Sequence, residues 1–489
     1  MSVFFSSDIE PQNVTLQDLR GAAARKKLTI SEKDEGDYLN LLRAADAAVR
    51  HVAELPKYTP PSLLPSSVPG YKRLSTEENL LNAWSHKAVA SDAAPTSGAL
   101  ADRTVAFKDN ISVAGLPITC GTFPEFVSGN GAYPISTVNA SVVSRVIEAG
   151  GTIAGTATSL LAAQAVRKWR ERNKITATEG EVSEELGVDL AIGGDQGGSI
   201  RLPCAFSGIY GLKPTHGLIP YTGIASLHPL IDHCGPMANS VADIALLLSV
   251  LAGYDGLDPR MTPESPLKKQ VEDYTANLQS QIDERAAAGK WNPGAAGSGL
   301  RVGLIKEAWE VPGLNPEIGK LVKDAAMRFS ALGATLQEVS IPLHKEGPII
   351  WTAATRASMA GFAFANAPPP LLSYSLPELE PPEPTQRWLD LLSHHNPAAP
   401  NVLLAGEYLN KRHPPVTTAK AMAHVLELRA AYDAALQDFD VLVLPANLTV
   451  APKHPPEGFG VMERIQLAAG NTANTSAVWE VGGLGLDTP

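Results

Sequence analysis

Apolar residues recur at helical spacing near the start of the chain. The spacing occurs twice, at Leu16, Leu19, Ala22 and Ala23 and again at Tyr38, Leu41, Leu42 and Ala45. A proline-dense stretch over residues 59–70 then ends the pattern, because neither a helix nor a β-ladder tolerates that proline density. We therefore expect an N-terminal helical region over residues 1–85 and a main domain over residues 86–489.

From about residue 100 onward, strand-like and helix-like segments alternate. The pattern predicts strands at 104–107, 152–154, 188–192, 300–305, 335–341 and 440–445, and helices at 141–149, 244–252 and 318–332. Glycines end two of these helices, and Ser240 with Asp243 forms a capping-box-like start to another. Such alternation is typical of an α/β fold with a parallel or mixed sheet. The proline-rich residues 368–400, which include His394 and His395, are expected to form a solvated surface insertion.

Composition narrows the class of protein. The 489 residues carry a formal charge of −11, with 44 % hydrophobic and 19 % charged residues, which is typical of a globular chain and excludes a disordered or fibrous one. Without a basic stripe, nucleic acid is not the expected partner. Three cysteines and eleven histidines lack metal-ligand spacing, so we expect no metal. With no signal peptide or membrane span recognisable, we expect a soluble cytoplasmic protein without a membrane partner.

A glycine-rich loop follows the predicted strand at 188–192, and it is the densest local motif of the chain: Gly193-Gly194-Asp195-Gln196-Gly197-Gly198-Ser199-Ile200-Arg201-Leu202-Pro203. A phosphate-binding loop would end in Gly-Lys-Ser/Thr, which this loop does not. A nucleophile elbow would place glycine two residues after the serine, where Arg201 stands. The remaining interpretation is a nucleophilic Ser199 whose oxyanion hole is the preceding backbone.

A serine at neutral pH needs a base, and Lys108 is the candidate. It directly follows the predicted buried strand at 104–107, where apolar neighbours would desolvate the amine and lower its pKa. Serine–lysine pairs are a known variant of triad chemistry. The alternative is a solvent-facing lysine and an ordinary turn serine. If the pair is functional, Lys108 and Ser199 lie within a few ångströms of each other, at the ends of neighbouring strands.

Several blocks of the chain resemble the amidase signature family, whose members use a Ser–cis-Ser–Lys triad. The resemblance rests on Val105–Ile111, Gly193–Pro203, Gly208–Thr215 and Gly235–Ala238, and Glu78–Trp84 points to the stand-alone bacterial and fungal branch. It implies an α/β amidase-signature fold, with a central mixed β-sheet flanked by helices on both faces. It also implies that no cofactor is needed and that the substrate is a small-molecule amide. A homodimer is the expected oligomeric state.

The resemblance assigns roles residue by residue. Ser199 matches the nucleophile that forms the acyl-enzyme, and Lys108 matches the general base. Asp195 and Arg201 match positions that brace the loop. The family's oxyanion hole corresponds to the backbone N–H groups of Gln196, Gly197, Gly198 and Ser199 in this chain. The implied reaction is attack on an amide carbonyl, loss of ammonia or an amine, and hydrolysis of the acyl-enzyme.

The chain departs from the family pattern where the relay serine is expected. That position, 24 residues before Ser199, is Ile175, which has no hydroxyl; Thr176, Thr178 or Ser183 are the candidate substitutes. The pattern is also shortened at residues 156–188 and at the C-terminus. Three hypotheses therefore stay open: an active amidase with an altered relay, a catalytically impaired homologue kept for binding or another role, and a glutaminase-like subunit of an amidotransferase.

Overall fold

Residues 1–61 and residues 62–489 form two separate units of the chain. The computed structural model describes residues 14–489, with gaps at 57, 76, 80–82, 93, 158–186, 262–264, 290–291, 293, 365–373, 375, 377, 454, 457, 479–484 and 488–489. The larger unit begins at Ser62, earlier than the boundary at 85 that the sequence suggested. The reason is that residues 71–72 pair with the main sheet.

The smaller unit contains the two helices expected from the apolar spacing, α1 (Leu16–Arg25) and α2 (Glu32–Glu54). Helix α1 begins with a capping box, in which the Thr15 and Asp18 side chains satisfy each other's backbone N–H groups. An ion pair joins the helices, with 2.6 Å between Arg20 Nε and Glu35 Oε1. The helical character predicted for this region is confirmed.

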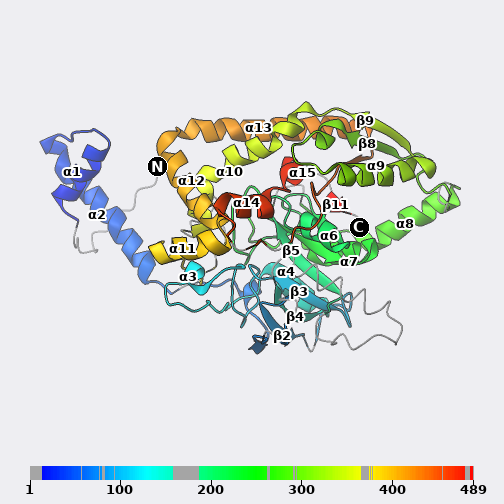
Figure 1. Cartoon of the computed structure of the whole chain (residues 1–489). Coiled ribbons are helices and arrows are strands. Elements are labelled where there is room, and N and C mark those ends of the chain that lie inside the picture. Colours follow the sequence, from blue (N-terminus) through cyan, green and yellow to red (C-terminus); the bar gives the residue numbers. More distant parts are fainter. Residues whose placement is uncertain are drawn as a thin grey trace. The chain divides into compact units, whose positions relative to one another are not determined.

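The larger unit is built on a mixed sheet, as expected (Figure 1). Within the described residues the sheet has eight strands, in the order β1 (Tyr71–Lys72), β2 (His86–Ala90), β4 (Thr152–Ala157), β3 (Thr104–Lys108), β5 (Leu190–Asp195), β7 (His233–Ala238), β6 (Tyr210–Lys213) and β11 (Gly485–Asp487). The β4–β3 and β3–β5 pairs are parallel, and the others are antiparallel. The parallel centre brings the ends of β3 and β5 to one edge.

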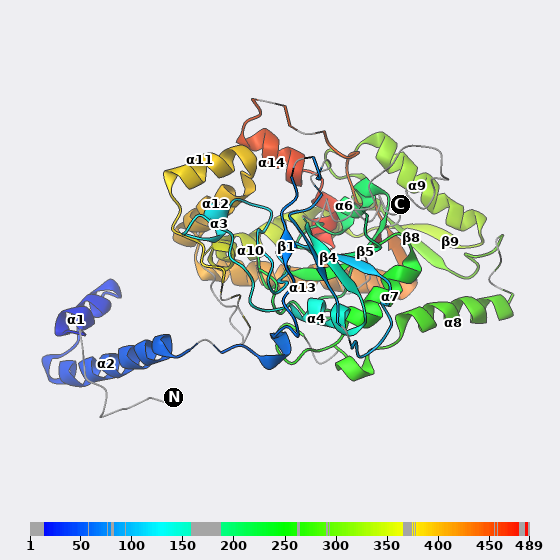
Figure 2. The same cartoon turned by 90° about the horizontal axis from the view of Figure 1, so that it is seen from below.

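Helices cover both faces of this sheet because the strand side chains alternate. Val105 and Phe107 of β3 join one apolar cluster, with α4 (Ser141–Glu148) and α7 (Val241–Leu251). Ala106, between them, joins a second cluster with α6 (Arg201–Ser207). Figure 2 shows α4 and α7 on one side of β4 and β5, with α6 on the other. The predicted two-sided layering is confirmed.

A second, parallel sheet follows in the chain, in the order β10 (Val441–Val443), β8 (Arg301–Ile305) and β9 (Thr335–Val339). Strand β10 is shorter than the strand expected at 440–445. It lies at the edge of this sheet, where Val441 is 46 % exposed. The remaining α-helices of the described residues are α3 (Pro124–Val127), α8 (Tyr274–Ala287), α9 (Pro316–Ala331), α10 (Gly347–Phe364), α11 (Gln386–His395), α12 (Ala398–Arg412), α13 (Pro415–Asp438), α14 (Val461–Ala469) and α15 (Ala473–Ala477).

The proline-rich segment 368–400 was wrongly expected to be a solvated insertion. Its described part contains α11 and the start of α12, and Trp388 and Leu392 are buried. Thr385 caps α11, so the prolines precede the helix instead of interrupting it. His394 and His395, expected in a loop, occupy the last turn of α11, where the His395 ring packs 5.0 Å from that of Phe123.

Arg145 of α4 holds the end of α7, which packs on the same face of the sheet. Its buried guanidinium donates to the carbonyls of Leu251, Ala252 and Gly253. Replacement by methionine keeps the volume but leaves these carbonyls without their donors. We expect Arg145→Met to lower the free energy of unfolding by about 2–4 kcal/mol, measured by urea titration.

The control for this variant is Arg328→Met on α9, where the side chain is exposed. It is expected to stay within about 0.5 kcal/mol of the parent chain. Equal stabilities of the two variants would show that the α4–α7 contact contributes nothing.

Candidate active site

The two predicted reactive residues meet in one pocket. Strands β3 and β5 are parallel neighbours, with Phe107 paired to Ile192, so their carboxyl ends share an edge of the sheet. Lys108 ends β3, and the glycine-rich turn follows β5. Lys108 and Ser199 both line a pocket of about 500 Å³, and Lys108 Nζ lies 3.5 Å from the carbonyl oxygen of Gly194.

A buried carboxylate organises the glycine-rich turn. Asp195 Oδ1 accepts hydrogen bonds from the Gly198 amide (2.7 Å) and Arg201 Nη2 (3.0 Å), while Oδ2 accepts from the Ile200 amide (3.2 Å) and Arg201 Nε (3.0 Å). Burial by itself would raise the pKa of Asp195, but the charge and hydrogen bonds of Arg201 outweigh burial and lower that pKa to about 2. The pair is therefore ionised at neutral pH.

Gly198 cannot be replaced by another residue without strain. Its φ of +136° is in the region that favours glycine, and a Cβ there would approach Thr475 Oγ1 to 2.6 Å. Its backbone N–H already donates a hydrogen bond to Asp195, so it is not available to stabilise an oxyanion. Of the four amides that the resemblance assigned to the oxyanion hole, those of Gln196, Gly197 and Ser199 stay as candidates.

Helix α15 holds the same turn from a distant part of the chain. Thr475 Oγ1 donates to the Gly197 carbonyl (2.7 Å), and the Thr475 carbonyl accepts from Arg201 Nη1 (3.0 Å). The preceding Asn474 is held by His344 Nε2, 2.9 Å from Asn474 Oδ1. A contact across more than 270 residues leaves no local signal.

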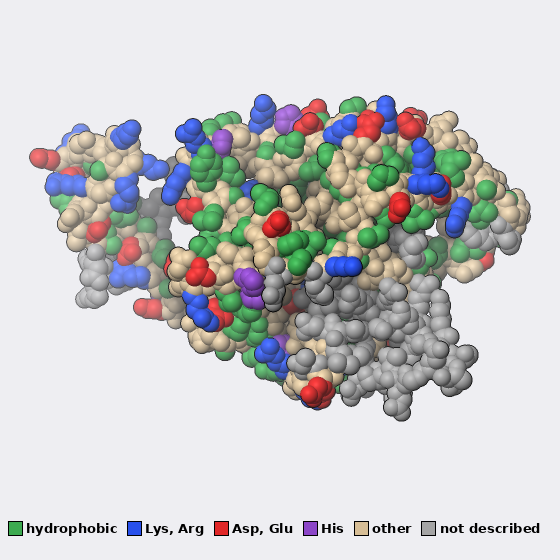
Figure 3. Space-filling view, viewed as in Figure 1, with side chains coloured by type: hydrophobic (Ala, Val, Ile, Leu, Met, Phe, Trp, Pro, Cys, Tyr) green, Lys and Arg blue, Asp and Glu red, His purple; other side chains and the backbone are tan. Residues whose placement is uncertain are grey.

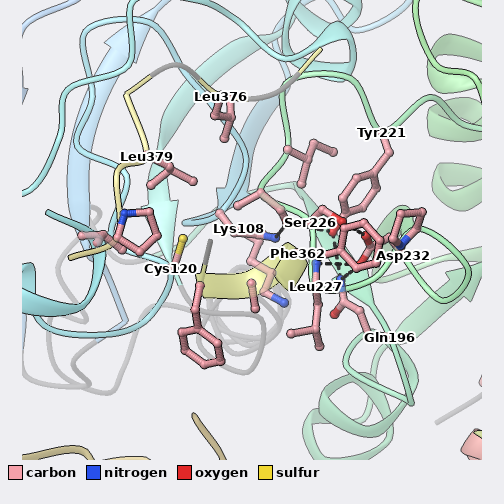
Figure 4. A pocket seen from close by; sticks show the side chains of 18 of the residues that line it. Lys108, Cys120, Gln196, Tyr221, Ser226, Leu227, Asp232, Phe362, Leu376 and Leu379 are labelled. Carbon is pink, nitrogen blue, oxygen red and sulfur yellow. Dashed lines mark hydrogen bonds between the residues drawn. The ribbon is translucent and has the colours of Figure 1, made fainter. Parts of the chain in front are cut away.

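The Gln196 side chain is fixed by a polar cluster on one side of the pocket. Gln196 Nε2 donates to Tyr221 Oη (2.8 Å) and to Asp232 Oδ1 (3.3 Å), and Ser226 Oγ donates to Asp232 Oδ2 (2.6 Å). Burial raises the pKa of Asp232. In the view of Figure 4, this cluster lies on one side of Lys108. The Gln196 carbonyl accepts from Trp351 Nε1 (3.0 Å) of α10, so backbone and side chain are both held.

Cys120 also lines the pocket, but its environment keeps the thiol protonated. Burial, together with the nearby Asp109 carboxylate, raises the pKa of Cys120 to about 12. The thiolate is the nucleophilic form of cysteine, and it is scarce at neutral pH under these conditions. The Cys120 thiol is therefore not activated as a nucleophile by its surroundings. Cys204 of α6 is fully buried in the second apolar cluster.

The relay position and its candidate substitutes lie outside the described residues. Ile175, Thr176, Thr178 and Ser183 all belong to residues 158–186.

Within the part of the chain that the structure describes, no group of three or more His, Cys, Asp or Glu residues could hold a metal ion. In that same part, no helix has both the length and the apolar character of a membrane span. On the face seen in Figure 3, basic and acidic side chains are interspersed.

Comparison with protein families gives the class. A family model described as Amidase matches residues 185–475. An enantioselective amidase from Rhodococcus rhodochrous is 32 % identical over 426 residues, covering 82 % of this chain and 75 % of that protein. The chain therefore belongs to the amidase signature family. One component of the glutamyl-tRNA(Gln) amidotransferase from Methanosarcina acetivorans is 33 % identical over 259 residues, but the match covers only 50 % of this chain and 48 % of that protein.

Solved structures agree on the fold. A bacterial aryl acylamidase of the amidase signature family has a TM-score of 0.56 at 18 % identity, covering 80 % of this chain and 76 % of that one. A 6-aminohexanoate cyclic dimer hydrolase has a TM-score of 0.54 at 18 % identity, with coverages of 81 % and 79 %. At these identities the likeness establishes the α/β fold with its mixed sheet, and nothing finer.

The Asp195–Arg201 pair predicts an acid-dependent stability. The folded pKa of Asp195 lies below its ordinary value, so the pair stabilises the fold above about pH 4, and this contribution is lost as the pH falls towards 2. Asp195→Asn leaves Arg201 buried without its anion. We expect a loss of about 3–5 kcal/mol in the free energy of unfolding at pH 7, and a smaller dependence on pH between 4 and 2.

Urea titrations at pH 7, 4, 3 and 2 measure both effects. The matched control is Asp324→Asn, since Asp324 makes an exposed ion pair with Lys320 and is expected to contribute less than about 1 kcal/mol. A pH dependence that is the same in Asp195→Asn and in the parent chain would contradict the role given to this pair.

Thr475 is predicted to restrain the turn through its hydroxyl. Thr475→Val keeps the shape but removes the donor to the Gly197 carbonyl, whereas Thr475→Ser keeps the donor. We expect the valine variant to lose about 1–2 kcal/mol of stability and to exchange the amide hydrogens of residues 196–201 faster. Hydrogen–deuterium exchange with mass spectrometry measures this. Thr352→Val, which removes a hydroxyl bonded only within α10, should leave exchange in the turn unchanged.

Proposed function

We propose that the chain hydrolyses a carboxylic amide to the acid and ammonia or an amine, through an acyl-enzyme on Ser199. One observation carries the proposal: Lys108 and Ser199 line the same pocket, beside a turn whose backbone is held by buried groups. Membership of the amidase family supports the reaction class.

Each group has a role in the proposed reaction. Ser199 Oγ attacks the amide carbonyl while its proton passes to Lys108. The backbone N–H groups of Gln196 and Gly197 stabilise the oxyanion, and Asp195 with Arg201 holds the turn in the shape that aims them. Lys108 returns the proton to the departing nitrogen. Water then attacks the acyl-enzyme, its proton goes to Lys108, and the carboxylic acid leaves as Ser199 regains its hydrogen.

In the proposed reaction, a side-chain hydroxyl group within residues 158–186 relays the proton between Ser199 and Lys108. Ile175 has no hydroxyl, so Thr176, Thr178 and Ser183 are the candidates. The competing hypothesis is an impaired amidase that lacks this relay. Triad members act as a unit, so loss of the relay hydroxyl would leave only a small part of the catalytic rate.

A second candidate function is the glutaminase-like component of an amidotransferase. It is favoured by identities of 31–33 % to several glutamyl-tRNA(Gln) amidotransferase components over about half of their length. A component of this kind works within a complex. Size-exclusion chromatography with light scattering therefore distinguishes it from a stand-alone amidase, and also tests the expected homodimer. Glutamine as the preferred substrate would favour this second function.

Ammonia release from a panel of aliphatic and aromatic amides tests the proposal. We expect Ser199→Ala and Lys108→Ala each to lower kcat about 10³-fold or more, because each removes a group that acts in the transition state. The matched controls are Ser330→Ala and Lys323→Ala, whose side chains are exposed on α9. Both controls are expected to keep the parent activity.

Two results would contradict the proposal. Turnover that survives Ser199→Ala would exclude the acyl-enzyme on this serine. A parent chain that releases no ammonia, but gains turnover when a Gly-Gly-Ser-Ser-Gly segment is rebuilt around residue 175, would identify an impaired amidase instead.

A further inference from the structure

The pocket that contains Lys108 and Ser199 has a large apolar wall. Most of its residues come from a part of the chain that is far from β3 and β5 in sequence. The wall residues come from α3, from the end of α10, from the segment 374–381 and from α12. They are Phe126, Val127, Phe362, Ala363, Phe364, Leu376, Leu379, Pro381 and Val402. In the view of Figure 4, Leu376 and Leu379 lie across Lys108 from Gln196 and Asp232. Phe362 lies beside Ser226 and Asp232 in the same view, so apolar side chains border Lys108 on both sides.

We propose that the substrate is an uncharged amide that carries an apolar ring, and that free glutamine is excluded. The proposal rests on the amide hydrolysis proposed above and names the substrate class of that same site. In it, the reacting amide faces Ser199 while the ring is buried against the apolar wall. A pocket of about 500 Å³ is large enough to enclose a molecule of this size.

The aromatic part of the wall is already packed without a ligand. Phe126 lies edge-on to Phe364, with ring centroids 5.4 Å apart, and Trp388 of α11 packs against both rings at 6.1 and 5.9 Å. Phe362 packs edge-on against His228, with centroids 5.0 Å apart. Side chains held in this way lose little freedom when a ligand binds, so the wall is preorganised for an apolar group.

The charged residues of the described lining, apart from Lys108, are partnered within the protein. Asp258 accepts from Arg260 Nε (2.9 Å) and Nη2 (2.5 Å), and Arg260 Nη1 donates to the Asp232 carbonyl (2.7 Å). The Asp232 carboxylate accepts from Ser226 Oγ, the Leu227 amide and Gln196 Nε2. A charged substrate would have to break these bonds or be buried beside the apolar wall.

Free glutamine carries both an α-carboxylate and an α-ammonium group. Each charge needs a partner when water is removed, and an unpaired charge in an apolar site is strongly unfavourable. A ring-bearing primary amide such as 3-phenylpropanamide has only the reacting amide as its polar group. The same pocket therefore favours this amide and disfavours glutamine, which separates this chain's site from a glutaminase site.

The test compares kcat/KM for 3-phenylpropanamide, acetamide and L-glutamine, followed by ammonia release. We expect 3-phenylpropanamide to exceed acetamide at least tenfold, since a single methylene in an apolar pocket already contributes about 10-fold or more. Glutamine is expected to fall below acetamide. Phe362→Ala should reduce the preference for the ring amide over acetamide about tenfold, while Phe362→Leu, which keeps apolar bulk, should retain most of it.

Phe329→Ala is the matched control, because that ring lies on α9 and is 42 % exposed; it should leave the preference unchanged. Calorimetric titration of the Ser199→Ala chain with 3-phenylpropanamide and with glutamine measures binding without turnover. Glutamine bound or turned over as well as the ring amide would overturn the proposed substrate class while amide hydrolysis stands. Binding of the ring amide that Phe362→Ala weakens, in a parent chain that hydrolyses no amide, would instead overturn only the proposed function.

Discussion

The buried ion pair between Asp195 and Arg201 is the constraint on which the site depends. A carboxylate this deep in the protein is stable only because Arg201 and two backbone amides surround it. Those amides belong to Gly198 and Ile200, on either side of Ser199, so the same bonds that satisfy the charge also fix the backbone that flanks the serine. The sequence around Ser199 therefore leaves little freedom for substitution, since the turn also requires glycine at 198.

The second sheet and its helices contribute to the site as well as to stability. Helix α15 bonds to the turn through Thr475, and Asn474 beside it is anchored by His344. Helix α10 reaches the turn through Trp351, and its last residues form part of the apolar wall. The part of the chain after residue 300 thus contributes contacts that hold the turn and side chains that line the pocket. The two proposed reactive residues lie at the end of β3 and in the turn after β5.

The sequence predicted what depends on local patterns. Apolar spacing and glycine stops located β3, α4, β5, α7 and α9. The loop motif singled out Ser199 and the end of a buried strand singled out Lys108, and both residues line one pocket. What failed was the proline-rich segment, because a proline count does not show that these prolines lie before α11 or at the N-cap and in the first turn of α12, where a helix tolerates proline. The contacts of Thr475 and the occupied amide of Gly198 were also missed. Both depend on tertiary geometry that no short motif encodes.

Burial disfavours the charged form of both Asp195 and Cys120, and the neighbouring charges decide the outcome for each group. Around Asp195 the cost of burial is outweighed by Arg201, so the pKa falls to about 2 and the carboxylate stays charged. Around Cys120 burial acts together with the Asp109 carboxylate, so the pKa rises to about 12. A thiol is ordinarily the more easily ionised nucleophile, yet here it is held neutral. Fixed charge therefore stabilises the carboxylate that holds the turn, where Arg201 opposes burial, whereas at Cys120 burial and the Asp109 carboxylate together outweigh Lys108.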